Sequence, residues 1–121
     1  PGLPGDATPP SRFVRAAFYQ ATAPKKQTAE ETVLQCFQIL NNFDIPVGIE
    51  FADGETPADI PSATQWTSAT DMKDLAIYYR TMHNSAIRKL DLKTIRFDKV
   101  KYQAVLLDAT KTQPITTIKV K

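Results

Sequence analysis

The chain has 121 residues and a formal net charge of +2 at pH 7, with 15 Lys and Arg against 13 Asp and Glu. The length suits one domain or part of a larger one, and such a domain buries enough surface for a core. The mild charge does not indicate nucleic-acid binding, which usually needs a clustered basic face, and one cysteine excludes an internal disulfide or a cysteine-rich metal site. No apolar run approaches the ~18 residues that span a membrane. We therefore expect no nucleic acid, no membrane, no metal and no other cofactor.

The first predicted helix covers about residues 8–23. Thr8 is a residue type that caps free backbone N–H groups, Pro9 suits the first helical position, and Pro24 ends the helix. Apolar residues at helical spacing predict a core-facing stripe made of Phe13, Val14, Ala17, Phe18 and Ala21. Arg12 lies on another face, in the first turn, where the helix dipole disfavours a cation. The charge of Arg12 therefore indicates a role toward something outside the helix.

The second predicted helix covers about residues 28–44. Thr28 and Glu31 form a capping box, in which each side chain satisfies a backbone donor of the other residue. An apolar stripe follows, made of Val33, Cys36, Phe37, Leu40 and Phe43. Asn41 and Asn42 weaken the helix, and Pro46 with Gly48 closes it. Because the linker between the helices is short, we expect them to be antiparallel neighbours.

From about residue 64 to residue 120 the pattern predicts antiparallel strands. The segments "TQWTSAT" (64–70), "LAIYYRTM" (75–82) and "AIRKLDL" (86–92) are joined by the turns "DMKD" and "HNS", which is typical of a meander. Two further strands are predicted at 102–108 and 115–120. The fold class is therefore α+β.

No complete active site is visible in residue types and spacing alone. His83 lies in a predicted hairpin turn with no nucleophile or orienting group near it in sequence, so an exposed turn histidine is the simpler interpretation. Cys36 lies on the apolar stripe of the second helix, which favours a buried small hydrophobe over a thiolate.

Two other groups of residues are also interpreted as structural. Asp53, Glu55 and Asp59 share a loop, but their spacing does not match a calcium-binding loop, which favours a solvated loop. Trp66 and the pair Tyr78–Tyr79 are expected to be half-buried strand residues.

Three motifs carry a resemblance to a known family. The opening "GLPGDATPPSRFVRAAF" (2–18) resembles the signature G-L-P-G-D-x-[ST]-x-x-S-R-F-V-[RK]-x-x-[FY] of the choloylglycine hydrolases, which include bile salt hydrolases and penicillin V acylases. The segment "FQILNNFDIPVG" (37–48) is similar to the family pattern FxILNxxxxPxG. The segment "YYRTMHNSAI" (78–87) is similar to YYRT-x-x-N-S-x-I. The resemblance covers nearly the whole chain.

The resemblance implies a four-layer αββα sandwich of the N-terminal nucleophile hydrolases, which cut linear amides. It places residues 1–121 as the C-terminal portion of a single such domain, consistent with a first residue that is Pro and not Met. The partners it implies are an N-terminal portion that carries the nucleophilic cysteine, a small-molecule amide substrate and further copies in a homotetramer. Cys36 does not match the position of that cysteine.

The resemblance also implies roles for individual residues. Arg12 matches the arginine of S-R-F-V, which belongs to the catalytic centre, and a fixed cation there stabilises a thiolate. Arg15 matches a position that is Arg or Lys, and we expect a structural ion pair from it. Arg80 matches the YYRT strand, where we expect a structural role before a substrate contact. The sequence indicates no substrate-binding residue.

Departures from the family pattern bear on the branch. His83 stands where an acidic residue is usual, and the loop 51–62 is unusual. These features predict the Gram-negative branch, hence the periplasm and substrates such as penicillin V or acyl-homoserine lactones. The bile salt hydrolase branch would instead be cytoplasmic. The alternative hypothesis is a non-catalytic α+β binding or structural module that retains an acylase-like segment.

Overall fold

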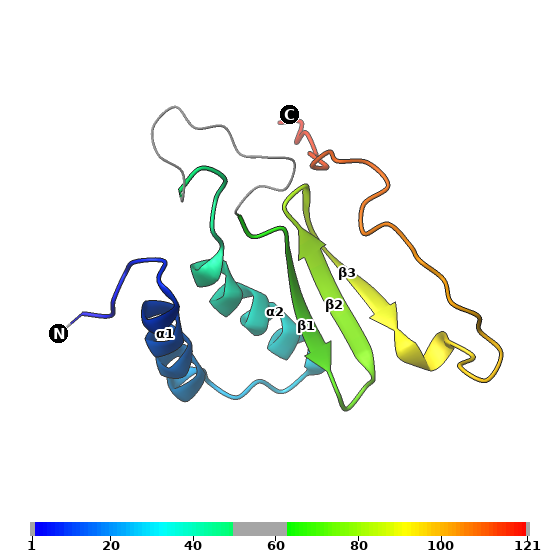
Figure 1. Cartoon of the computed structure of the whole chain (residues 1–121), viewed down its shortest axis with the longest axis horizontal. Coiled ribbons are helices and arrows are strands. Elements are labelled where there is room, and N and C mark those ends of the chain that lie inside the picture. The colour runs from blue at the N-terminus through cyan, green and yellow to red at the C-terminus, as the bar shows by residue number, and fades with distance from the viewer. Residues whose placement is uncertain (1, 50–62, 121) are drawn as a thin grey trace. The chain divides into compact units, whose positions relative to one another are not determined.

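The computed structural model describes residues 2–49 and 63–120. Two helices precede three strands along the chain (Figure 1). The chain divides into two compact units, Pro1–Thr64 and Gln65–Lys121, so the helices belong to one unit and the strands to the other. The predicted α+β class is confirmed.

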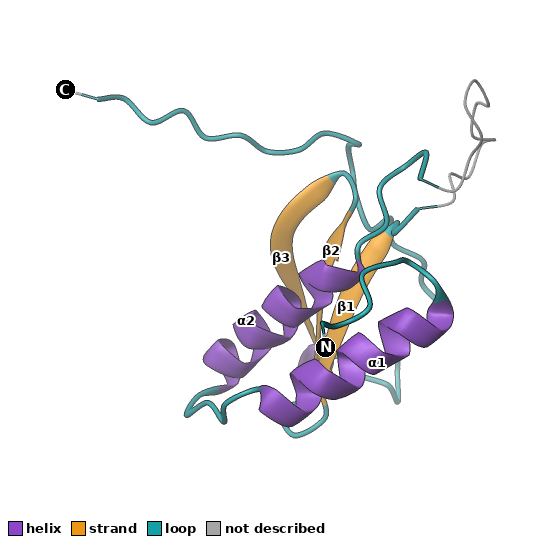
Figure 2. Ribbon diagram, turned by 90° about the vertical axis from the view of Figure 1, so that its left-hand side faces the viewer, coloured by secondary structure: helices purple, strands orange, loops and turns teal. Residues whose placement is uncertain are grey.

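Helices α1 (Pro9–Thr22) and α2 (Ala29–Leu40) lie side by side and antiparallel (Figure 2). Two contacts join α1 to the turn just beyond α2. Tyr19 near the end of α1 donates to Asn42 Oδ1 at 3.3 Å and packs edge-to-face against Phe43 just beyond α2, with ring centroids 6.4 Å apart. Both predicted helices and their antiparallel arrangement are confirmed.

The start and end of α2 have local causes that the sequence contains. Thr28 and Glu31 form the predicted capping box. The Glu31 carboxylate accepts from the backbone N–H groups of Thr28 and Gln27, which hold its pKa below the ordinary value. At the other end α2 tightens into a 3₁₀ turn, η1 (Asn41–Phe43), where the Asn42 side chain donates to Ile39 O at 3.0 Å.

The predicted core stripe of α1 is wrong for this chain. Phe13 is 74% exposed, Val14 and Phe18 are also exposed, and the one buried residue of α1 is Arg15. An amphipathic helix buries its apolar face only against a second layer, and no described residue covers this face. Helix α2 behaves differently, because Phe37 of its stripe is only 2% exposed.

The strands form one antiparallel sheet in the order β1–β2–β3, with β1 (Trp66–Asp71), β2 (Ala76–Thr81) and β3 (Asn84–Asp91). Trp66 pairs with Thr81, and Ala76 pairs with both Asp71 and Asp91. The predicted meander over these three strands is confirmed. The central strand β2 is the most buried of the three, as its position between two neighbours requires.

Each hairpin turn is supported by a side chain at the end of a strand. Asp71 Oδ1 accepts from the backbone N–H groups of Lys73 at 3.0 Å and Asp74 at 2.9 Å, and Leu75 then adopts a left-handed conformation with φ 54°. In the second hairpin, the backbone N–H of Asn84 donates to Thr81 Oγ1 at 3.2 Å. The turn therefore covers Met82 and His83, one residue shorter than "HNS".

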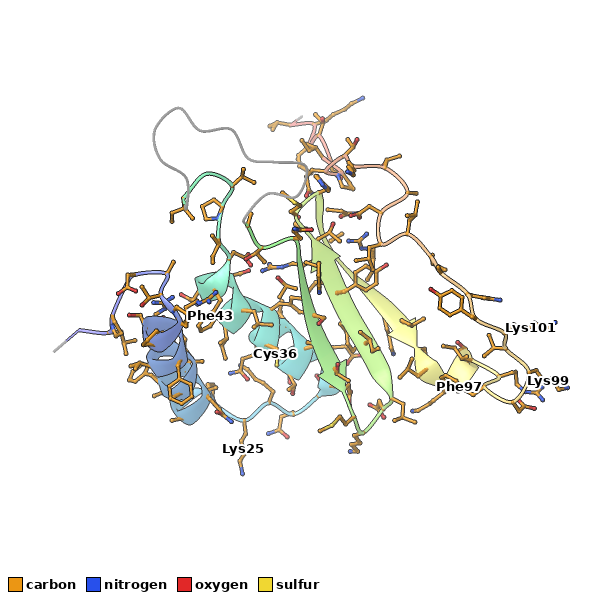
Figure 3. The ribbon with its side chains drawn as sticks, in the orientation of Figure 1. Lys25, Cys36, Phe43, Phe97, Lys99 and Lys101 are labelled. Carbon is orange, nitrogen blue, oxygen red and sulfur yellow. The ribbon has the colours of Figure 1, made fainter. Side chains whose placement is uncertain are left out.

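The two later strand predictions, at 102–108 and 115–120, are wrong for this chain. After β3 come the 3₁₀ turn η2 (Leu92–Thr94) and a segment without strands, in which Tyr102 is 94% exposed. A β-prone segment becomes a strand only when another strand pairs with its backbone, and no described strand does so here. Figure 3 labels Phe97, Lys99 and Lys101 along this segment.

The described residues bury few apolar side chains. Phe37 and Ala76 are the buried hydrophobic residues among them. None of the described helices has the length and apolarity needed to cross a membrane.

We predict that Thr28→Ala lowers the free energy of unfolding by about 1 kcal/mol, because it removes the hydroxyl that accepts from Glu31 N at 3.1 Å. Urea denaturation of the protein measures the change. Gln20→Ala, at an exposed position of α1, is the control and is expected to stay within ~0.5 kcal/mol of wild type. Equal effects of the two substitutions would contradict the capping role.

Candidate active site

The first turn of α1 holds Arg12 in a fixed place. Thr8 is the N-cap residue, Pro9 and Pro10 open the helix, and the backbone N–H of Arg12 donates to Thr8 O at 3.0 Å. Prolines at these positions cost nothing, because the first N–H groups of a helix have no partner within it. Arg12 therefore projects from a rigid helical turn and not from a loop.

The Asp6 carboxylate accepts hydrogen bonds at the start of α1, where the sequence predicted a cap from the Thr8 side chain. The Thr8 hydroxyl makes no capping bond and instead donates to the Asp6 carboxylate. That carboxylate also accepts from Thr8 N at 2.9 Å and from Ser11 Oγ at 2.8 Å. These hydrogen bonds lower the pKa of Asp6 to about 2, and the hydrogen bond from the Thr8 hydroxyl has the largest effect. An anion thus lies beside the positive end of the helix dipole, although the first turn itself contains no acidic residue.

Arg15 is the most deeply placed cation of α1. It is 9% exposed, and its Nη1 donates to Pro4 O at 2.8 Å and to Asp6 O at 2.7 Å. Its guanidinium carbon lies 5.6 Å from the centroid of the Phe43 ring, which Figure 3 labels at the end of α2. The expected ion pair from Arg15 is wrong, because its partners among the described residues are two backbone carbonyls and an aromatic ring.

A pocket of about 440 Å³ opens beside these two arginines. We call it the arginine pocket. It is bounded by the loop before α1, by α1 and by the chain that follows α2, and its lining consists of Gly5, Asp6, Ala7, Arg12, Arg15, Asn42, Phe43, Asp44, Ile45 and Ile49.

The two arginines of the pocket differ in their contacts. Arg15 donates through one guanidinium nitrogen to both loop carbonyls. Arg12 is half-buried, and its guanidinium makes no hydrogen bond or ion pair with any residue in 2–49 or 63–120. A guanidinium stays charged even when it is partly desolvated. The arrangement can therefore stabilise an anion that enters the pocket.

A second hollow, of about 280 Å³, lies between the later parts of α1 and α2. Its polar groups are amides and hydroxyls such as Tyr19, Gln35 and Gln38, and no charged side chain lines it among the described residues. It offers neither a nucleophile nor a charge for catalysis.

The other chemically active residues are not among those that line the arginine pocket or are outside the described residues. Cys36 is half-buried on α2, and His83 is half-buried in the β2–β3 turn, less exposed than expected. Asp53, Glu55 and Asp59 lie outside the described residues. Within the described residues, no group of three or more His, Cys, Asp or Glu is placed to hold a metal ion.

The aromatic residues and Arg80 occupy the sheet. Tyr78 and Tyr79 are half-buried on β2, as expected, whereas Trp66 at the start of β1 is 60% exposed. Arg80 is half-buried on β2 opposite Thr67. None of these residues lines the arginine pocket.

Sequence reasoning missed a cluster around Arg88 on β3. Arg88 Nη1 forms an ion pair with Asp108 Oδ1 at 2.5 Å and donates to Leu107 O at 2.7 Å, and the guanidinium carbon lies 4.6 Å from the Tyr79 ring centroid. Hydrogen bonds from Thr81 and Arg88 hold the pKa of Asp108 below its ordinary value. The partners of Arg88 are up to 20 residues away in sequence, so no local spacing could have indicated them.

Comparison with known proteins supports the motifs. The family model of linear amide C–N hydrolases, choloylglycine hydrolase family, matches residues 1–105. A bile salt hydrolase/transferase of Lactiplantibacillus plantarum is 38% identical over 98 residues, which cover 80% of this chain and 29% of that protein.

Solved structures agree with this result. A mutant conjugated bile acid hydrolase from Clostridium perfringens matches with a TM-score of 0.70 and 29% identity, covering 98% of this chain and 34% of that one. A penicillin V acylase from Agrobacterium tumefaciens matches with a TM-score of 0.63 and 26% identity, covering 78% of this chain and 28% of that one. The chain thus spans between 28% and 34% of the length of these three relatives.

These matches define the class of protein first: the fold is that of the N-terminal nucleophile hydrolases, to which this chain contributes two helices and a three-stranded antiparallel sheet. Within that class the chain belongs to the choloylglycine hydrolase family of linear amide C–N hydrolases.

We predict that Asp6→Asn destabilises the protein in a pH-dependent way. A carboxylate with a depressed pKa stabilises the folded state above its ordinary pKa of 3.8, and this stability is lost as pH falls toward about 2. The difference in unfolding free energy between wild type and Asp6→Asn is therefore expected to be full at pH 5 and to shrink below about pH 4.

Urea denaturation at several pH values measures this difference. Ser11→Ala removes one of the hydrogen bonds to the same carboxylate and is expected to give a smaller effect with the same pH dependence. A wild-type advantage that is as large at pH 2.5 as at pH 5 would contradict the role of the Asp6 charge.

Proposed function

We propose that this chain is the C-terminal part of a cysteine N-terminal nucleophile hydrolase that cleaves linear amide bonds, and that Arg12 is its catalytic residue. The observation that carries the proposal is the Arg12 guanidinium. It lies on the S-R-F-V motif of the family, lines the arginine pocket and makes no hydrogen bond or ion pair with the described residues.

The chemistry of a cysteine nucleophile explains why such a cation is needed. A thiol with the ordinary pKa of about 8.5 is mostly protonated at pH 7, and the thiolate is the reactive form. A fixed cation nearby lowers the thiol pKa, and each pKa unit corresponds to about 1.4 kcal/mol. Arg12 supplies that charge from a rigid turn of α1, and Asp6 compensates the helix end without occupying the guanidinium.

The reaction proceeds by covalent catalysis. The α-amine of the N-terminal cysteine accepts the thiol proton, and the thiolate attacks the carbonyl of the scissile amide. The C–N bond breaks as the amine leaves with a proton, and an acyl-thioester forms. Water then hydrolyses the thioester and releases the acid. Cys36 does not take this role, because it lies within α2 and has no free α-amine.

The nucleophilic cysteine belongs to an N-terminal portion of the enzyme outside these residues. Two observations support this partner. The chain spans 34% or less of the relatives described above, and the apolar face of α1 lacks a cover among the described residues. Exposed apolar surface on one helix face is typical of an interface. Assembly into a homo-oligomer, as the family resemblance implies, is part of the proposal.

We predict that Arg12→Ala lowers kcat/KM of the full-length enzyme by about 10²-fold or more, because the substitution removes the cation that stabilises the thiolate and developing oxyanion. Arg12→Lys keeps a charge but changes its geometry, and is expected to retain part of the activity. Arg96→Ala is the matched control. Arg96 is an exposed arginine paired with Asp98 at 3.2 Å, and its loss is expected to leave turnover unchanged.

Near-normal hydrolysis by a folded Arg12→Ala enzyme would contradict the assignment. Folding is checked by circular dichroism and by the midpoint of thermal unfolding. A wild-type protein that hydrolyses no linear amide would instead favour the non-catalytic binding module.

The branch of the family leads to a separate prediction. The residues 83 and 51–62 favour the Gram-negative branch, with a periplasmic location and penicillin V as a better substrate than a conjugated bile salt. We therefore expect kcat/KM for penicillin V to exceed that for glycocholate. The reverse ranking would favour the bile salt hydrolase branch and a cytoplasmic enzyme, and both rates are measured by the amine released.

A further inference from the structure

Arg15 joins the segments that form the arginine pocket. It belongs to α1, its guanidinium donates to the carbonyls of Pro4 and Asp6 in the preceding loop, and it lies over the ring of Phe43 in η1. These three segments supply most of the described residues that line the pocket, and the others lie in the chain after η1. We call this set of contacts the Arg15 clamp.

The burial of Arg15 needs an explanation. A charged group that is 9% exposed loses most of its hydration, which is costly unless hydrogen bonds replace the water. Here two main-chain carbonyls replace it, and among its hydrogen bonds in the described residues there is none to a carboxylate. A helix position that only filled space would be served by an apolar residue. The contacts of Arg15 indicate that this position fixes the loop.

The fixed loop forms one wall beside Arg12. Gly5, Asp6 and Ala7 line the pocket together with the Arg12 guanidinium. Arg12 and Arg15 are three residues apart and so lie on one face of α1, yet only Arg15 is engaged by the loop. If the loop moved away, water would enter beside Arg12 and weaken the effect of its charge.

We propose that Arg15 is a positioning residue, which holds loop residues 4–6 against α1 and thereby keeps the Arg12 guanidinium in a pocket of restricted water access. The proposal rests on the proposed function, because it concerns how strongly Arg12 stabilises the nucleophile. It differs from that function in assigning the pocket wall to a residue that does not touch the reacting atoms.

The test compares Arg15→Met with Arg88→Met in the full-length enzyme. Arg88 is a matched control because it also donates through Nη1 to a main-chain carbonyl, Leu107 O, and also lies over a ring, that of Tyr79. Arg88 belongs to the other compact unit and does not line the pocket. Both substitutions remove a partly buried guanidinium, so both are expected to lower the thermal unfolding midpoint.

Two readouts separate a positioning role from a purely structural one. The first is hydrogen exchange of the Thr8 backbone amide, which donates to the Asp6 carboxylate at 2.9 Å and which we expect to exchange about tenfold faster or more in Arg15→Met only. The second is the pH dependence of kcat/KM. Its acid limb is expected to move to higher pH in Arg15→Met, because a better-screened Arg12 stabilises the thiolate less. In Arg88→Met the acid limb stays where it is.

The conservative variant Arg15→Lys keeps the charge and part of the donor capacity, and is expected to restore part of both readouts. If Arg15→Met does not fold, the same two measurements are made on Arg15→Lys. Unchanged exchange of the Thr8 amide, or faster exchange without movement of the acid limb, would overturn the positioning role. Failure of the proposed function is recognised separately, as absence of turnover in the wild-type enzyme.

Discussion

The hydrogen bonds from one buried guanidinium to two loop carbonyls organise the first unit of this chain. Arg15 Nη1 contacts Pro4 O and Asp6 O, and the same group lies over Phe43 beyond α2. The loop before α1 is rich in proline and glycine and has few backbone donors and little apolar surface to hold it. A permanently charged donor is well suited to that task, since it satisfies two carbonyls at once and stays protonated.

The charges at the start of α1 then follow from one another. A cation in the first turn conflicts with the helix dipole, and the conflict is relieved from outside the helix. The Asp6 carboxylate accepts from Thr8 and Ser11 and so brings a negative charge to the helix end without forming an ion pair with Arg12. The Arg12 guanidinium, which lines the pocket, therefore has no ion pair with the described residues. An acidic residue within the first turn would be within reach of the guanidinium and would compete with any anion that the pocket receives.

Features encoded by neighbouring residues could be predicted from the sequence, and features that need distant partners could not. The capping box of Thr28 and Glu31, the weak helix end at Asn41 and the three-stranded meander are all local, and all three occur. The position of Arg12 in the first turn was also local. The Arg15 contacts were not, because a helix arginine looks the same in sequence whether it binds a carboxylate, a carbonyl or water. The predictions of a buried stripe around Phe13 and of a strand at 102–108 were wrong for a further reason. Periodicity predicts which face or segment is able to pack, but not whether the chain provides a partner.

The difference between local and distant contacts also explains how Arg12, the catalytic residue that we propose, can be well placed in a chain with few buried apolar side chains. Among the described residues only Phe37 and Ala76 are buried hydrophobic residues, so large-scale packing contributes little to the position of Arg12. Hydrogen bonds to the Asp6 carboxylate and from the Arg15 guanidinium, which span at most 11 residues of sequence, hold its surroundings instead. Polar contacts of this kind keep their geometry without a neighbouring layer, whereas the apolar face of α1 gains its stability only when another surface covers it. Short-range polar contacts therefore hold the loop beside Arg12, and the chemistry that we propose for the pocket depends on the proposed N-terminal portion for both the cover and the nucleophile.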